Sequence, residues 1–192
     1  MADTNKVLFG FSDLYVGTYT VSDAGVVTMG TPYHQKGAVG FSPEENNDQE
    51  VFYADNIPYF TTYSTGTYEG DLTVAKFDDE FKKNFLGYVQ LDDGGLAQIK
   101  GASKPNIYMM FEIQGDQHKR RAIFYNGSLG AISREYSTIE ENKTPVTESI
   151  SVTFTGDNGT GITKVTYNED DSGYDTLFTA PPAPALPSAS AS

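Results

Sequence analysis

The residues whose types could support catalysis or metal binding are few and scattered in this sequence. The chain of 192 residues contains two histidines, His34 and His118, and no cysteine. Without cysteine it can have no thiolate nucleophile, no disulfide and no cysteine-based metal site. Neither histidine has a carboxylate at the spacing of a metal-binding motif, so we interpret both as solvated surface side chains.

Carboxylates are abundant, but they form no recognisable catalytic pattern. A glycosidase needs two carboxyl groups whose environments separate their pKa values, and no such pair stands out. The acidic turns at residues 92–95 and 169–171 lack the alternating ligand spacing of a calcium loop. The glycine-rich segment 156–161 lacks the lysine and the following helix of a phosphate-binding loop. We therefore expect no cofactor, no metal ion and no enzymatic activity.

The charge of the chain limits the partners that it can bind. Asp and Glu number 26 against 13 Lys and Arg, which gives a net charge of -13. A protein that reads a DNA sequence normally carries a basic patch instead. The one basic cluster, Lys119, Arg120 and Arg121, follows Glu112 and Asp116 across a predicted hairpin. We expect it to form salt bridges across the strands or to a neighbouring subunit. The competing interpretation is a nucleic-acid-binding patch, which three positive charges against a net charge of -13 support only weakly. No signal-peptide pattern and no apolar run of about 18 residues is present, so we expect no membrane association.

Short strands separated by turns must position these residues. Runs rich in Val, Ile, Thr, Tyr and Phe alternate with Gly, Asp and Asn turns, and this pattern is typical of a β-sandwich. We predict a mainly β domain over residues 1–179, with two packed sheets, one flanking α-helix and a long protruding β-hairpin loop. Residues 180–192 contain only Ala, Pro, Ser and Leu, which predicts a flexible Pro/Ala/Ser-rich tail. The predicted strands are residues 6–11, 14–20, 26–29, 36–42, 69–77, 105–114, 118–126, 145–155 and 162–167.

The flanking helix is predicted over residues 78–86. Asp78 is suited to the N-cap, acidic residues follow it in the first turn, and Gly87 is suited to end the helix. Phe77, Phe81 and Phe85 recur every four residues and would form one apolar stripe. We expect this stripe to dock the helix onto the flank of the sandwich.

The protruding hairpin loop is predicted over residues 43–63. It combines acidic residues and asparagines with many aromatic residues. A small domain cannot bury such a long polar hairpin, so we expect it to contact a neighbouring subunit. The candidate interface residues are Glu45, Asn47, Asp48, Glu50, Phe52, Tyr53, Asn56, Tyr59, Phe60 and Tyr63, together with Lys119, Arg120 and Arg121.

Four segments occur in an order that resembles a known family. They are Val7–Thr20, Phe52–Gly87, Phe111–Gly127 and Thr147–Phe154. Together they resemble the major tail proteins, or tail tube proteins, of bacteriophages with long non-contractile tails. The resemblance covers residues 5–167, and the aromatic hairpin followed by a strand and a Phe-striped helix is its most specific part.

This resemblance implies assembly rather than catalysis. Proteins of this family form hexameric rings that stack into the hollow tail tube of the virion, and genomic DNA passes through it without sequence-specific binding. One sheet of each subunit joins a continuous β-barrel, and the long loop, here Pro43–Tyr63, packs onto neighbouring subunits. The implied partners are further copies of the chain and the tape measure, distal tail and terminator proteins. The implied place of synthesis is the host bacterial cytoplasm. A strongly acidic lumen would repel DNA phosphates within a Debye length of about 10 Å.

A different class of function is compatible with the same residues. A secreted or surface β-sandwich module could bind carbohydrate or protein through aromatic loops, with Tyr53, Tyr59, Phe60 and Tyr63 stacking on sugar rings. The two hypotheses differ in their assembly. A tube protein should form rings or tubes at high concentration, whereas a binding module should stay monomeric and bind glycans.

Overall fold

The chain folds into antiparallel strands and one short helix. The computed structural model describes residues 5–54, 57–136 and 146–187. Residues 47–54 and 58–65 are described by their backbone alone, whereas the side chain of Ile57 between them is exposed. In chain order the elements are β1 (Leu8–Val21), β2 (Val27–Met29), β3 (Tyr33–His34), β4 (Ala38–Ala54), β5 (Ile57–Val74), α1 (Asp79–Leu86), β6 (Tyr88–Gln90), β7 (Leu96–Gln98), β8 (Ile107–Gly115), β9 (Arg120–Arg134), β10 (Glu148–Phe154) and β11 (Lys164–Asn168). The prediction of a mainly β fold with one helix is confirmed.

Two layers arise because strand β9 belongs to both of them. The strand order is β2-β1-β8-β9-β10-β5-β4, with β3 beside β1 and β11 beside β9. β9 bends at Asn126, whose φ is 53°. Before the bend it pairs with β8 and β11, and from Gly127 onward it pairs with β10. We call β1, β2, β8, β11 and the start of β9 the first half-sheet, and residues 127–134 of β9 with β10, β5 and β4 the second half-sheet.

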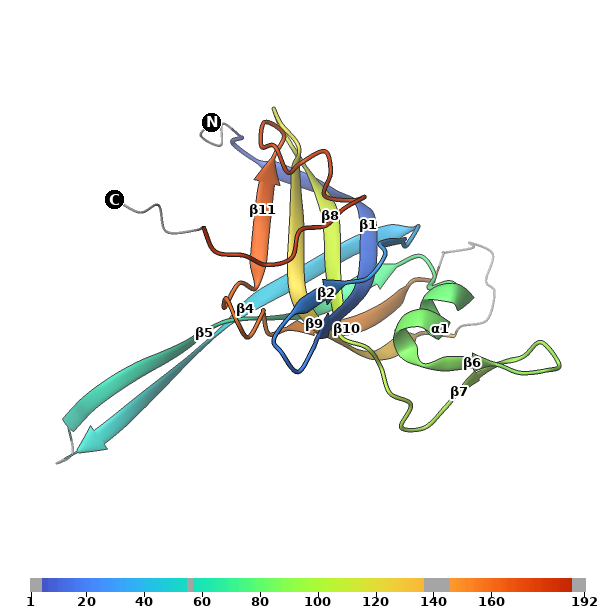
Figure 1. Cartoon of the computed structure of the whole chain (residues 1–192), viewed down its shortest axis with the longest axis horizontal. Coiled ribbons are helices and arrows are strands. Elements are labelled where there is room, and N and C mark those ends of the chain that lie inside the picture. Colours follow the sequence, from blue (N-terminus) through green and yellow to red (C-terminus); the bar gives the residue numbers. More distant parts are fainter. Residues whose placement is uncertain (1–4, 55–56, 137–145, 188–192) are drawn as a thin grey trace.

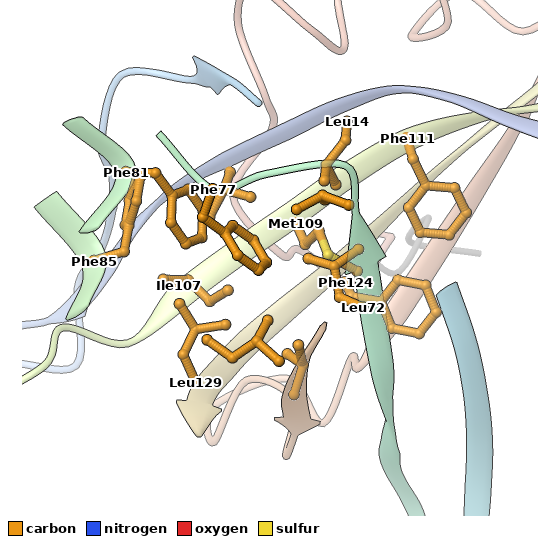
Figure 2. Packing of buried hydrophobic residues seen from close by; sticks show 14 of the residues in the cluster. Leu14, Leu72, Phe77, Phe81, Phe85, Ile107, Met109, Phe111, Phe124 and Leu129 are labelled. Carbon is orange, nitrogen blue, oxygen red and sulfur yellow. The ribbon is translucent and has the colours of Figure 1, made fainter. Parts of the chain in front are cut away.

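The main hydrophobic core lies between the two half-sheets and under α1. Phe41 of β4 contacts Phe111 and Phe124 of the first half-sheet at ring-centroid distances of 5.7 and 5.8 Å. Figure 2 shows the core side chains converging from both layers, with the phenylalanines of the helix at one end. Phe77 and Phe81 are fully buried and stack at 4.8 Å. The apolar stripe therefore fixes the helix to the sheet.

Local capping defines the two ends of α1. The Asp78 side chain accepts a 2.7 Å hydrogen bond from the backbone N–H of Phe81, which satisfies one of the free donors at the helix start. Gly87 has φ 70° and ends the helix in the left-handed conformation. The Tyr33 hydroxyl donates to the second Asp78 oxygen at 2.5 Å and ties the cap to β3.

A second core covers the outer face of the first half-sheet. Tyr108 and Met110 of β8 are fully buried in this second core, whereas the alternate residues Met109 and Phe111 face the main core. Because both faces of β8 are covered, its sequence is apolar at both parities. The cover is the C-terminal segment after β11, from Gly173 to Pro187, whose Leu177 is fully buried.

The C-terminal segment remains against the domain beyond the predicted boundary at residue 179. The Tyr125 hydroxyl donates a 3.0 Å hydrogen bond to the Pro182 carbonyl oxygen, and Pro184 is buried. The described part of the predicted tail, up to Pro187, therefore lies on the second core. Its flexibility stays a prediction, and residues 188–192 lie outside the described part.

β4 and β5 extend beyond the layers as a two-stranded arm, seen at the lower left of Figure 1. β10 accompanies β5 only from Tyr68 to Val74, so within the described part of the chain residues 46–54 and 57–67 pair only with each other. The pairing continues from Asn46 opposite Thr67 to Ala54 opposite Ile57. The predicted protruding hairpin is thus a paired ribbon rather than an open loop. An isolated two-stranded ribbon is only marginally stable in water.

The strands differ from the predictions in several places. β4, β5 and β9 extend well beyond the predicted residues 36–42, 69–77 and 118–126, and β3 was not predicted. Residues 6–11 and 14–20 belong to one strand, β1, because Asp13 takes a positive φ of 51° and forms a bulge instead of a turn. The acidic turn at residues 92–95 joins β6 and β7, which form a small hairpin outside the predicted strands. Figure 1 places this hairpin at the opposite end of the molecule from the arm.

Candidate assembly surfaces

The second half-sheet has one bare face, which we call the open face. Ile150, Val152 and Phe154 of β10 are buried in the core, so the alternate residues of the strand point away from it. The sequence alternates in the same way, with Thr or Ser at every second position from Thr147 to Thr155. The open face consists of Ser42 and Glu44 from β4, Glu69, Asp71 and Thr73 from β5, and Ser149, Ser151 and Thr153 from β10.

Negative charge is concentrated on the open face. Glu44 lies directly opposite Glu69 in the β4–β5 register, and Asp71 lies two residues further along the same face. Like charges opposite each other destabilise a sheet. The stability of the isolated subunit therefore does not explain this pair.

The open face offers no site for catalysis or metal binding. It forms a wide shallow hollow lined by serine, threonine, glycine, valine and three carboxylates, with no lysine or arginine among the lining residues. Across the described residues, no group of three or more His, Cys, Asp or Glu side chains is arranged to hold a metal ion. This arrangement can provide a solvent-exposed, negatively charged surface.

The structure places most of the candidate arm residues on paired backbone. Phe52 lies opposite Phe60 and Tyr53 opposite Pro58, while Glu50 and Asp48 pair with Thr62 and Ser64. Asn47, Tyr59 and Tyr63 lie on the same two strands, and Asn56 lies outside the described residues. Nearer the body, Glu45 engages the Tyr68 hydroxyl, whose pKa is raised by burial and by this carboxylate. The interface role of these residues stays a prediction.

The basic cluster pairs within the chain. Glu112 of β8 lies opposite Arg121 of β9 and is only 3% exposed. Its carboxylate accepts from Arg121 Nε at 3.2 Å and from Lys119 Nζ at 2.8 Å. The structure therefore forms the cross-strand salt bridge, one of the two alternatives that the sequence left open. Arg120 lies opposite Ile113 of β8 and Asn168 of β11.

Electrostatics explain why Glu112 stays ionised. Burial alone would raise the pKa of Glu112, but hydrogen bonds from Lys119, Arg121 and the Tyr174 hydroxyl outweigh it and hold the pKa below its usual value. Tyr174 belongs to the C-terminal segment, and its own pKa is raised to about 12 by burial and by Glu112. The cluster thus connects β8, β9 and the C-terminal segment.

Each histidine lies beside one acidic side chain. His34 stacks on Tyr15 at a ring-centroid distance of 4.5 Å, and its Nε2 lies 3.9 Å from Asp13. His118 Nδ1 lies 3.6 Å from Glu169. Both imidazoles are partly exposed, as expected for surface side chains.

Comparison with known proteins gives the family. The family model described as "Phage tail tube protein" matches residues 2–151. The fold is also similar to two solved structures: the tube-terminating cap of an anti-feeding prophage and the sheath–tube complex of an extracellular contractile injection system in its extended state. The first is 10% identical, with a TM-score of 0.47 over 87% of this chain and 97% of that chain. The second is 9% identical, with a TM-score of 0.45 over 81% and 88%. No curated protein matches the chain.

The chain belongs to the phage tail tube protein family, since the matched region covers well over half of it. It is therefore a structural component of a phage virion, in a family that is not a class of enzymes. In the part of the chain that the structure describes, no helix is long and apolar enough to cross a membrane.

Proposed function

We propose that this protein is the subunit of the tail tube of a phage with a long non-contractile tail. Its copies form hexameric rings that stack around a lumen, and genomic DNA passes through that lumen during delivery. The family match supports tube assembly in general. The observation that carries the finer proposal is the second half-sheet, which buries one face, leaves the other bare and acidic, and continues into an arm.

The open face is suited to the wall of the lumen. DNA carries one negative charge for about every 1.7 Å of helix axis, and basic side chains hold it through counterion release. The serine, threonine and carboxylate side chains of the open face offer no such cations. DNA would move past this wall without being retained by it.

The arm is suited to contacts between copies. Its backbone beyond Asn46 and Thr67 is supported by no other strand of the described chain, and a lone ribbon of this kind gains stability when a partner covers it. Copies that bind one another head to tail can close into a ring or continue as a filament. A stack of rings bridged by arms would cover each arm with a neighbouring copy and would close the head-to-tail contacts within each ring.

The binding-module alternative would use Tyr53, Tyr59, Phe60 and Tyr63, whose backbone lies on the paired strands β4 and β5. The family match favours assembly over this alternative.

Shortening the arm tests the proposal. Asp48 and Ser64 face each other, so replacing Gln49–Tyr63 with Asn-Gly should close the ribbon with a two-residue turn. We expect the wild-type protein to form hollow tubes on concentration, by negative-stain microscopy and sedimentation velocity. The shortened variant should remain folded and monomeric. Tubes formed equally well without the arm would contradict its role.

A matched control tests whether the loss of assembly is specific to the arm or follows from shortening any exposed hairpin. Val89 and Ala97 face each other in the other exposed hairpin, so Gln90–Leu96 can be replaced by Asn-Gly in the same way. This control should assemble like the wild type. Both variants should keep the β-sheet circular dichroism signal, which excludes unfolding as the cause of any loss.

A further inference from the structure

The chain contains two Asn-Gly dipeptides, Asn126-Gly127 and Asn158-Gly159. In such a dipeptide the backbone nitrogen of the glycine can attack the side-chain amide of the asparagine, because glycine has no Cβ to hinder the approach and has the most mobile backbone of all residues. The reaction proceeds in water without an enzyme or a cofactor. In a folded protein its rate depends on how firmly the two residues are held, and the structure holds these two dipeptides very differently.

The first dipeptide is locked into the sheet. The Asn126 side chain donates to the Gly156 carbonyl oxygen at 2.7 Å and accepts from the Asn106 side chain at 2.9 Å, so both ends of its carboxamide are occupied. Gly127 lies in register with β8 on one side and with β10 on the other. Attack on the Asn126 amide therefore requires local opening of β9.

The second dipeptide lies in an exposed turn. Asn158 and Gly159 are both exposed, and within the described part of the chain the Asn158 side chain forms no hydrogen bond. The attacking nitrogen is held only at one point, since the Gly159 N–H donates to the Asp157 carboxylate at 3.1 Å. The neighbouring Thr160 N–H donates to the same oxygen at 2.7 Å, so the carboxylate keeps a partner when Gly159 leaves it.

The reaction at this turn is balanced without any further reactant than water. The Gly159 nitrogen bonds to Cγ of Asn158, and the Cγ–Nδ2 bond breaks. The proton of the Gly159 N–H passes through water to the departing nitrogen, which leaves as ammonia. One water molecule then opens the cyclic imide. Opening at one carbonyl gives aspartate, and opening at the other gives isoaspartate, in which the backbone runs through the former side chain and is one atom longer.

This turn also braces the base of the arm. The Asp157 N–H donates to the Ile162 carbonyl oxygen at 3.0 Å and closes the turn. The next residue, Thr163, is buried, and its hydroxyl donates to the carbonyl oxygen of Gly66. Gly66 lies in the part of β5 that β10 does not accompany. An extra backbone atom within the turn must be taken up between these two contacts.

We propose that Asn158 is a site of spontaneous deamidation in the folded protein, whereas Asn126 is protected, and that isoaspartate at position 158 loosens the brace between this turn and the base of the arm. The subunit thus carries a slow covalent change beside its most extended element. Both effects take place within one subunit, whether or not copies assemble.

The two dipeptides are each other's control in a test of the modification. The purified subunit is incubated at mildly alkaline pH, where more of the backbone nitrogen is deprotonated, and is then digested and analysed by mass spectrometry. The peptide with Asn158 should gain one dalton and become a substrate of isoaspartate methyltransferase. The peptide with Asn126 should react more than about tenfold more slowly, because it reacts only from a locally opened state. In urea the two rates should become similar.

Two results would overturn the modification site. The first is an equal rate at Asn158 and Asn126 in the folded protein. The second is an unmodified Asn158 after a period in which the unfolded chain has converted. Asn158→Gln keeps the amide on a longer side chain, so that attack requires a larger and slower-forming ring. This variant should stay unmodified at position 158 throughout.

Hydrogen exchange tests the effect on the arm. Ion exchange separates the aged wild-type protein by its new negative charge, at a concentration where no tubes form. The backbone of residues 66–72 should exchange faster in the isoaspartate fraction than in fresh protein, whereas α1 should exchange equally in both. Aged Asn158→Gln should match the fresh protein. Unchanged exchange of residues 66–72 in the isoaspartate fraction would overturn the brace.

One further variant separates the charge from the lengthened backbone. Freshly purified Asn158→Asp carries the additional carboxylate on a backbone of ordinary length, so its residues 66–72 should exchange like those of the fresh wild type. Exchange as fast as in the isoaspartate fraction would overturn the role given to the extra backbone atom. None of these measurements depends on tube formation, so the proposed function stands or fails separately.

Discussion

The guanidinium of Arg121 lies 4.0 Å from the centre of the Tyr174 ring, and its Nη1 donates a 2.7 Å hydrogen bond to the Tyr174 carbonyl oxygen. The same side chain lies 4.3 Å from the Phe178 ring. Arg121 therefore fastens the C-terminal segment over the second core while its Nε pairs with Glu112. A residue that the sequence offered as a subunit contact has a structural role inside its own chain.

Replacing Arg121 with methionine should destabilise the folded subunit. The Glu112 carboxylate would keep Lys119 but lose its more buried cationic partner, and the contacts of the guanidinium with Tyr174 and Phe178 would be lost as well. Removing one partner of a buried ion pair typically costs about 3–5 kcal/mol, and we expect a loss toward the lower end of this range. The midpoint of urea unfolding should fall accordingly. Lys119→Met is the control, since the Lys119 ammonium is exposed and screened by solvent. Equal effects of the two changes would show that Arg121 has no special role in the fold.

Stability should fall in acid partly through Asp157. Burial favours the protonated form of Asp157, but hydrogen bonds from Tyr19, Thr160 and Gly159 outweigh it and lower the pKa. A carboxylate with a lowered folded pKa stabilises the protein fully above the unfolded value of about 3.9, and this contribution is lost as pH falls through the folded pKa.

Asp157→Asn tests this contribution to acid sensitivity. The variant should lose less unfolding free energy than the wild type between about pH 5 and pH 2, because the group that titrates is gone. Urea unfolding measured across this range gives the comparison. Identical pH profiles for the two proteins would remove Asp157 as a cause.

Phe81 should be the most sensitive position of the helix. It is fully buried and packs between Phe77 and Phe85 at centroid distances of 4.8 and 5.1 Å. Truncating such a ring to alanine typically costs about 3–5 kcal/mol. Phe81→Ala should therefore lower the unfolding free energy by this amount in a denaturant titration, while the exposed Lys83→Ala changes it by less than about 0.5 kcal/mol. An unchanged midpoint for Phe81→Ala would show that the helix is not docked as described.

Features governed by nearby residues could be predicted from the sequence. The limits of α1 follow from Asp78 and Gly87, which act within one turn of the helix. The polar parity of β10 likewise follows from alternation along a single strand. In both cases the residues that decide the structure are neighbours in the chain.

Features decided by distant contacts could not be predicted. The bend of β9 depends on Asn126, which is tied by hydrogen bonds to Asn106 and to the Gly156 carbonyl oxygen. The predicted break between residues 6–11 and 14–20 is wrong because nothing near Asp13 in the sequence indicates that β8 continues beside it. The hydrogen bond from Lys104 to the Leu129 carbonyl oxygen of β9 joins segments 25 residues apart, and an isolated lysine gives no signal of it.

A cryo-electron microscopy reconstruction of the concentrated protein is the most direct test of the central claim. The account predicts a hollow tube of stacked six-membered rings, with Glu69, Asp71 and Ser151 of the open face lining the lumen and arms reaching adjacent copies. Particles that remain single at high concentration, or a tube whose lumen is lined by another face of the subunit, would contradict it.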